Sequence, residues 1–88
     1  MYYPDFLIYS KKKIIEFFGD YWHCNPNIYE STFYNKVLQK SANDVWKHDN
    51  ERIHNIISEG YDVLIIWENE IIENFNECME KCIEFINN

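Results

Sequence analysis

Three carboxylates occupy positions where the neighbouring sequence favours apolar side chains. Asp5 opens the apolar run 5–9, and Glu16 interrupts the next apolar run, 13–18. Asp49 falls in line with the apolar residues of a helical pattern further along the chain. An unpaired carboxylate buried among apolar groups costs several kcal/mol, comparable to the whole stability of a small domain. Proteins keep such groups where they hold a cation, pair with a base or face a cleft.

Asp5 and Glu16 are candidate ligands for one metal ion. The two apolar runs that carry them are expected to pair as a hairpin, which would bring the two carboxylates together. Carboxylate oxygens are hard ligands, and the ion that suits them best here is Mg²⁺. The alternatives are structural: Asp5 as a solvated strand end, and Glu16 as an exposed carboxylate at the edge of the hairpin.

His23 is the residue best suited to transfer a proton, because an imidazole titrates near neutral pH. A contact with Asp49 would orient the ring and stabilise its charged form. The alternative for His23 is a packed or surface histidine. The alternative for Asp49 is a salt bridge to Arg52 or Lys47 at the rim of the helix.

The first half of the chain predicts a hairpin followed by a long loop. Runs 5–9 and 13–18 predict two antiparallel strands with both faces covered, because nearly every position is apolar. Residues 19–40 predict an irregular segment with one helical turn around 32–39. Long loops in compact domains are commonly functional, and this loop contains His23.

A helix, a strand and a second helix complete the chain. Residues 41–59 have helical spacing, with Ser41 or Asn43 as a cap and Gly60 as a stop signal. Residues 63–67 predict a buried strand, and residues 69–87 predict the second helix. The order β-β-α-β-α, with a connection long enough for a right-handed crossover, predicts an α/β fold with a small mixed β-sheet flanked by helices. The apolar positions of the two helices are Ala42, Val45, Trp46, Ile53, Ile56 and Ile57, then Ile71, Ile72, Phe75, Cys78, Met79, Cys82, Ile83 and Ile86.

Composition sets wider limits on the function. The 88 residues suit a single domain, and the 47% hydrophobic content predicts a packed core. The net charge of −7 argues against a stand-alone nucleic-acid binder. No apolar run is long enough to cross a membrane and there is no signal-peptide pattern, so a cytoplasmic location is expected. The three cysteines do not suggest a disulfide framework, and Cys78 and Cys82 are expected to be core thiols.

Two parts of the chain resemble the very-short-patch-repair (Vsr-like) endonuclease domains of the PD-(D/E)XK nuclease superfamily. The string Tyr3-Pro4-Asp5-Phe6 is followed, after a short hairpin, by Gly19-Asp20-Tyr21-Trp22-His23. In that family a Pro-Asp-Phe string opens the first core strand, and the next strand ends in Gly-x-x-Trp-His. Downstream, Asp49 and the string Gly60-Tyr-Asp-Val-Leu-Ile-Ile-Trp-Glu68 match the family's helical acid and its Gly-(Trp/Tyr)-x-Val-x-x-x-Trp-Glu string. The resemblance covers nearly the whole chain.

The resemblance implies a restriction-endonuclease-like fold and hydrolysis of DNA phosphodiester bonds with Mg²⁺, for which Mn²⁺ could substitute. Asp5 corresponds to the metal-binding aspartate, and the backbone carbonyl of Phe17 to a further metal ligand. His23 corresponds to the histidine that activates water, and Asp49 to its partner acid. Glu16 matches a glutamate that related members use, as a further catalytic and metal-binding carboxylate.

The chain departs from the mismatch-repair members of the family in several places. Phe18 stands where they carry a second histidine. Asp20 stands where they carry a cysteine that holds a structural zinc, so no structural zinc is expected. Their upstream helix with a further glutamate is absent. These departures favour the sister group that is similar to phage-type homing endonucleases of the EDxHD kind. That group has an aspartate at the position of Asp20, so Asp20 is a secondary site candidate. A mismatch-repair nicking enzyme is the alternative within the family.

Double-stranded DNA is the partner that the resemblance implies. Tyr21 and Trp22 could stack on bases near the cut, although Trp22 is expected rather to pack beneath the loop. The candidate phosphate contacts are Lys11, Lys12, Lys13 and Lys47, with Lys36 and Lys40 as further lysines. The alternative for the cluster at 11–13 is a solvated turn.

The sequence also favours a domain of a longer protein, because the chain begins abruptly at Met1. A homing enzyme would carry a separate DNA-recognition domain, and would act in the host cytoplasm if it is phage-encoded. A homodimer is left open. The alternative outside enzymes is a catalytically silent, nuclease-like interaction domain, which the acidic charge would suit.

Overall fold

A three-stranded mixed sheet forms the centre of the molecule. The computed structural model describes residues 5–88. Strand β1 (Phe6–Ile8) pairs antiparallel with β2 (Lys13–Phe18), and β2 pairs parallel with β5 (Asp62–Trp67). The strand order is β1-β2-β5. The predicted hairpin and the mixed α/β class are therefore confirmed.

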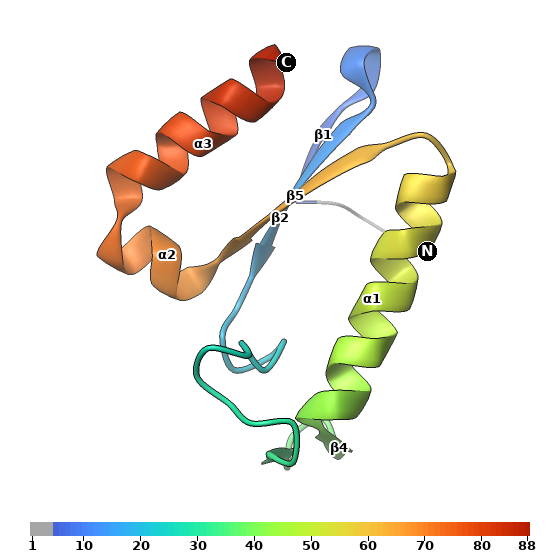
Figure 1. Ribbon diagram of the computed structural model, residues 1–88, viewed down its shortest axis with the longest axis vertical. Helices are drawn as coiled ribbons and strands as arrows, with labels where there is room; N and C mark the ends of the chain where they lie inside the picture. The colour runs from blue at the N-terminus through green and yellow to red at the C-terminus, as the bar shows by residue number, and fades with distance from the viewer. Residues whose placement is uncertain (1–4) are drawn as a thin grey trace.

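Helices lie on both faces of this sheet. Helix α1 (Ala42–Ser58) covers one face, and α2 (Glu68–Glu73) and α3 (Phe75–Asn87) cover the other (Figure 1). The predicted start of α1 is confirmed, since Ser41 Oγ accepts a backbone N–H of the first turn at 3.2 Å. The predicted stop is confirmed as well, because Gly60 follows the helix with a φ of 98°, a conformation that side chains with a Cβ rarely adopt.

The predicted single helix over 69–87 is wrong, because the chain breaks at Asn74. This residue has a φ of −139° and both ends α2 and begins α3. Its N–H donates to the Glu70 carbonyl at 2.8 Å, and the Cys78 N–H donates to the Asn74 carbonyl at 3.0 Å. Asparagine is better suited to helix ends than to helix interiors. The apolar periodicity continues across the break, so the pattern alone could not reveal it.

The predicted helical turn around 32–39 is also wrong. Strands β3 (Tyr34–Asn35) and β4 (Lys40–Ser41) form a small antiparallel hairpin there. Asn35 is fully buried, and its Oδ1 accepts the N–H groups of Val37 and Leu38 at 3.1 and 3.0 Å. An asparagine side chain that binds the backbone just ahead of it closes a turn in place of a helix.

Alternate residues of β2 face different helices. Ile15 packs with Ile66 and with two cysteines of α3, Cys78 and Cys82. The side chain of Glu16 points the opposite way and meets Arg52 of α1. The prediction that Cys78 and Cys82 are core thiols is confirmed, since they are free and only 2% and 8% exposed. The side of β2 toward α1 therefore holds the Glu16–Arg52 pair, and the side toward α3 holds the core cluster around Ile15.

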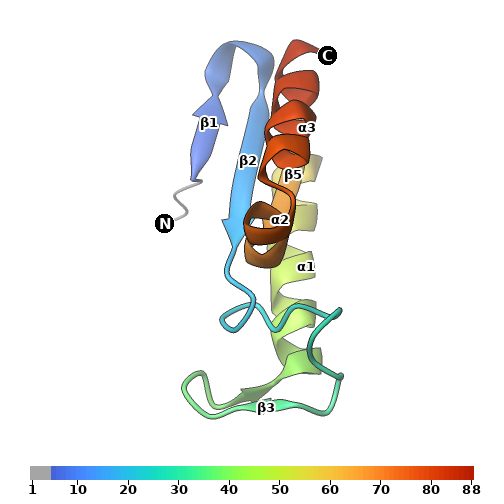
Figure 2. The ribbon, with the colours of Figure 1, turned by 90° about the vertical axis from the view of Figure 1, so that its left-hand side faces the viewer.

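Strand β1 is less covered than the sequence predicted. Figure 2 places it at the edge of the sheet, beside the helices rather than beneath them. Phe6 is 50% exposed, so the predicted cover on both faces is wrong for β1, whereas β2 is buried except at Phe17. Four residues of the predicted apolar stripes are likewise exposed, namely Ile57, Ile72, Phe75 and Ile83. Within residues 5–88, none of the helices has the length and hydropathy needed to cross a membrane.

Candidate active site

A histidine and an aspartate from distant parts of the chain meet on the α1 side of the sheet. His23 lies in the loop after β2, and its Nδ1 is 2.8 Å from Asp49 Oδ2 on α1. The imidazole stacks on the Phe18 ring with centroids 3.8 Å apart, and it meets the Trp67 ring edge-on at 6.5 Å. These contacts hold both the plane and the rotation of the ring. Because Nδ1 is engaged by Asp49, proton exchange with a substrate falls to Nε2.

The loop that presents His23 is held by a buried asparagine. Asn25 is fully buried, and its Nδ2 donates to Asp20 Oδ1 at 2.9 Å and to Asn69 Oδ1 at 3.2 Å. Its Oδ1 accepts the Asn27 N–H at 3.0 Å. Asp20 also donates its own N–H to Glu68 Oε1 at 3.0 Å. Asp20, a secondary site candidate from the sequence, therefore lies in the scaffold that ties the loop to the start of α2.

Two further hydrogen bonds fix the other side of the same loop. Asn35 Nδ2 donates to the Tyr21 carbonyl at 3.0 Å, and Trp46 Nε1 donates to the Cys24 carbonyl at 2.6 Å. Sequence reasoning missed the roles of Asn25 and Asn35. The available signal was weak, because asparagine is common in loops and only the structure shows that both side chains are buried.

Arg52 links the second buried carboxylate to the His23–Asp49 pair. Its Nη1 is 3.4 Å from Glu16 Oε1, and its Nη2 is 3.9 Å from Asp49 Oδ1. Burial raises the pKa of the Glu16 carboxyl above its ordinary value, and the Arg52 guanidinium partly offsets that rise. The guanidinium also lies 5.8 Å from the centre of the Phe18 ring. Sequence reasoning saw Arg52 only as a rim partner of Asp49.

Asp5 lies at the start of β1, beside the end of β2. Its Oδ2 accepts the Phe17 N–H at 2.8 Å, and its side chain is exposed. Tyr3 and Pro4 of the nuclease-like string lie outside the described residues. The structure thus brings Asp5 to the Phe17 backbone and Glu16 to Arg52. Across residues 5–88, no cluster of three or more His, Cys, Asp or Glu side chains is placed to hold a metal ion.

Residues of the described part of the chain line cavities at and beside this site. One of about 270 Å³ lies between the sheet and α1 and is lined by Phe18, His23, Pro26, Trp46, Asp49, Asn50, Ile65 and Trp67. Another of about 290 Å³ is lined by Trp22, His23, Leu38, Lys40, Val45, His48 and Asp49. A third of about 530 Å³ is lined by Phe17, Phe18, Gly19, Tyr21, Trp22, Glu68, Ile71 and Ile72. Trp22 is 52% exposed, so the expectation that it packs beneath the loop is wrong.

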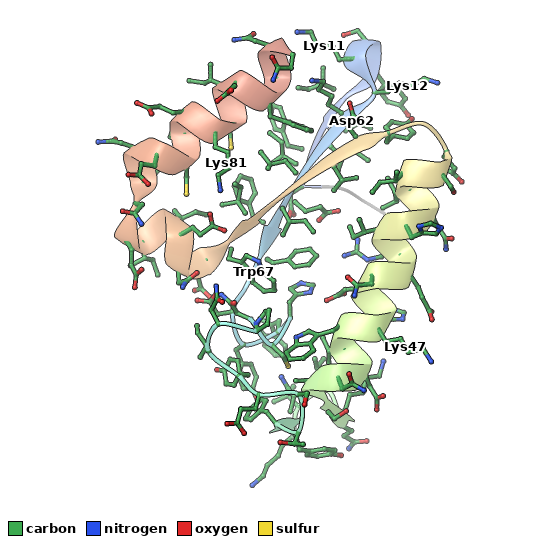
Figure 3. All side chains as sticks on the ribbon, in the orientation of Figure 1. Lys11, Lys12, Lys47, Asp62, Trp67 and Lys81 are labelled. Carbon is green, nitrogen blue, oxygen red and sulfur yellow. The ribbon has the colours of Figure 1, made fainter. Side chains whose placement is uncertain are left out.

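The lysines proposed as phosphate contacts lie in different environments. Lys13 is buried, and its Nζ donates to the carbonyls of Phe85 and Asn88 at the end of α3. Lys11 Nζ donates to the carbonyl of Ile86 at 2.6 Å. Figure 3 shows Lys11 and Lys12 at the tip of the β1–β2 hairpin and Lys47 on the outer side of α1.

Comparison with known protein families, with curated proteins and with solved structures gives no significant match.

Proposed function

We propose that this chain is a metal-dependent DNA endonuclease domain, of the Vsr-like type related to phage homing endonucleases, with His23 and Asp49 at its active centre. The observation that supports this most directly is the 2.8 Å contact between His23 Nδ1 and Asp49 Oδ2. A histidine oriented by a carboxylate is the arrangement that general-base catalysis needs. Two residues of the nuclease-like strings, Trp22 and Trp67, line the cavities that His23 and Asp49 also line.

His23 is assigned the role of general base. Its Nε2 takes the proton from the attacking water, and Asp49 stabilises the imidazolium that results. The Phe18 ring below the imidazole limits its motion, so the proton acceptor is held in place before substrate binds.

The donor atoms beside β2 suit a hard divalent cation. Asp5 offers an exposed carboxylate, and carboxylate oxygens can accept a hydrogen bond and bind a cation at once. The N–H and C=O of one extended residue point to the same side of a strand, so the Phe17 carbonyl faces the same way as the N–H that Asp5 accepts. We therefore assign Asp5 and the Phe17 carbonyl as ligands of Mg²⁺ or Mn²⁺. When bound, such an ion would polarise the scissile phosphate.

Glu16 fits the metal less well than Asp5. Its side chain is 7% exposed and pairs with Arg52, so a cation would have to compete with the guanidinium. We assign Glu16 to holding Arg52, and through it Asp49, in position. The net charge of −7 implies weak DNA affinity for this domain by itself, so target recognition is assigned to a separate domain.

Cleavage of supercoiled plasmid tests the proposal. Wild-type protein at high concentration is compared with Asp5→Asn and His23→Ala, in Mg²⁺, in Mn²⁺ and in EDTA. The matched control is His54→Ala, because His54 is an exposed histidine on the same helix as Asp49. We expect nicking or linearisation by wild type and His54→Ala in either metal, and none by the two site variants.

The other outcomes separate the remaining assignments. Activity that persists in Asp5→Asn and His23→Ala would refute the site. Nicking without linearisation, on a plasmid with a T:G mismatch only, would favour the mismatch-repair alternative. Complete inactivity of all four proteins, together with no shift of the melting temperature by Mg²⁺ or Mn²⁺, would favour the silent interaction domain.

A further inference from the structure

Some basic side chains of this acidic chain are already bound to other groups of the protein, and others are not. Half of the eight Lys and Arg side chains are engaged within the fold. Lys11 and Lys13 donate to carbonyls at the end of α3, Arg52 pairs with Glu16, and Lys81 pairs with Glu70 at 2.9 Å. The three-lysine cluster at 11–13, the most basic string of the sequence, is therefore largely used in holding α3.

Of the four remaining cations, Lys12 lies at the tip of the β1–β2 hairpin, and the other three lie on the β3–β4 hairpin and on α1. Within residues 5–88, no ion pair within 4.0 Å involves Lys36, Lys40 or Lys47, which lie on the β3–β4 hairpin and on α1. By contrast, residues 68–88 hold six glutamates and one lysine. Residues 68–88 thus carry five of the seven net negative charges, on the opposite face of the sheet from α1, while α1 itself carries Asp44, Asp49 and Glu51 beside Lys47 and Arg52.

The cavity of about 290 Å³ joins this basic region to His23. Lys40 comes from β4 and His48 from α1, and both side chains are exposed where they line the cavity. Asp49 also lines it, but its carboxylate is already paired with His23 at 2.8 Å and with Arg52 at 3.9 Å. Lys40 supplies an ammonium to the lining of this cavity, and His23 and His48 supply imidazole nitrogens. Trp22 forms an apolar wall beside them.

We propose that the backbone of duplex DNA docks on the β3–β4 hairpin and the first half of α1, with a phosphate held in this cavity by Lys40 and His48. The inference rests on the proposed nuclease function and adds to it the direction from which the DNA approaches. A phosphodiester oxygen accepts hydrogen bonds from an ammonium and from an imidazole N–H, and such contacts fix the register of a protein on the duplex without reading its sequence. His23 lines the same cavity, so a phosphate bound there lies next to the general base. The glutamates of α2 and α3 repel the backbone from the opposite face.

Fluorescence anisotropy with a labelled DNA duplex tests the docking surface without requiring cleavage. Binding of the wild-type chain is measured in Ca²⁺ over a range of salt concentrations, and compared with Lys40→Gln, His48→Gln and the double variant. The control Lys81→Gln removes the same single charge elsewhere, on α3. Circular dichroism confirms that each variant is folded.

We expect Lys40→Gln to weaken binding and to reduce the slope of log K against log salt by about one, as for the loss of one phosphate contact. His48→Gln should weaken binding further in the double variant, and Lys81→Gln should bind as wild type does. If Lys81→Gln weakens binding as much as Lys40→Gln does, or if Lys40→Gln and His48→Gln have no effect, the docking surface is overturned. The plasmid assay still decides the nuclease function in either case. Absence of wild-type binding at about 0.1 mM protein and low salt, the weak end of non-specific DNA binding, overturns it as well.

Discussion

Replacing Arg52 with methionine should show how much the stability of the fold depends on the pairing of the buried Glu16. The side chain of Glu16 is 7% exposed and that of Arg52 is 26% exposed. Truncating one partner of a buried ion pair costs about 3–5 kcal/mol, because the other charge stays buried. The 3.4 Å separation and the partial exposure of Arg52 let water replace part of the interaction. We therefore expect Arg52→Met to lower the free energy of unfolding by about 2–3 kcal/mol.

The loss of unfolding free energy in Arg52→Met should depend on pH, and the pKa of Glu16 determines the direction of that dependence. Burial raises the pKa of Glu16, and the Arg52 guanidinium opposes that rise. A carboxyl whose folded pKa lies above its unfolded value contributes stability that is complete below the unfolded pKa and is lost as pH rises through the folded pKa. Removing Arg52 raises the folded pKa of Glu16 further. The deficit of Arg52→Met should therefore be largest at about pH 7 and smaller at about pH 4, where Glu16 is protonated.

Urea unfolding in EDTA at both pH values measures this, with a midpoint shift of about 1–2 M expected at the higher pH. The matched control is Lys81→Met, which removes the exposed pair between Lys81 and Glu70, with side chains 50% and 32% exposed. That control should cost less than about 1 kcal/mol. The double variant Glu16→Gln/Arg52→Met should be less destabilised than Arg52→Met alone. An equal deficit at both pH values, or one no larger than that of Lys81→Met, would refute the reasoning.

Two further substitutions test how the loop and the helix end are built. Asn25→Ala should lower the free energy of unfolding by about 2–4 kcal/mol, because it removes two donor contacts, to Asp20 and Asn69, and leaves buried acceptors without their partner. Thermal unfolding measures that loss, and a melting temperature equal to wild type would mean that the loop does not need this residue. Gly60→Ala should cost about 1–2 kcal/mol, because the φ of 98° is strained for any residue with a Cβ, while the added Cβ lies no closer than 3.9 Å to Lys12 Nζ. Denaturant unfolding tests it, and a neutral or stabilising effect would contradict the strain argument.

Only part of the candidate site could be predicted from the sequence. Asp49 and His23 stood out because a carboxylate on an apolar stripe and a histidine in a long loop are both unusual, and their contact was one of the arrangements considered. The assignment of Glu16 to Arg52 was not foreseen. A carboxylate on a strand can either bind a metal together with Asp5 or pair with Arg52, and the local sequence is the same in both cases. Which of the two Glu16 does depends on which helix packs against that face of β2.

The fold, like the site, could be predicted only in part from the sequence. Residue patterns with a period of two or of 3.6 determined the hairpin, α1, β5 and the α/β class, because burying one face of a strand or helix requires such a pattern. The same patterns missed the break at Asn74 and the β3–β4 hairpin, where a single asparagine redirects the backbone through its own hydrogen bonds. Tertiary structure alone decided which lysines are available and which carboxylates meet a cation. Those outcomes depend on contacts between residues far apart in the chain, such as Lys13 with Asn88, and local periodicity carries no information about them.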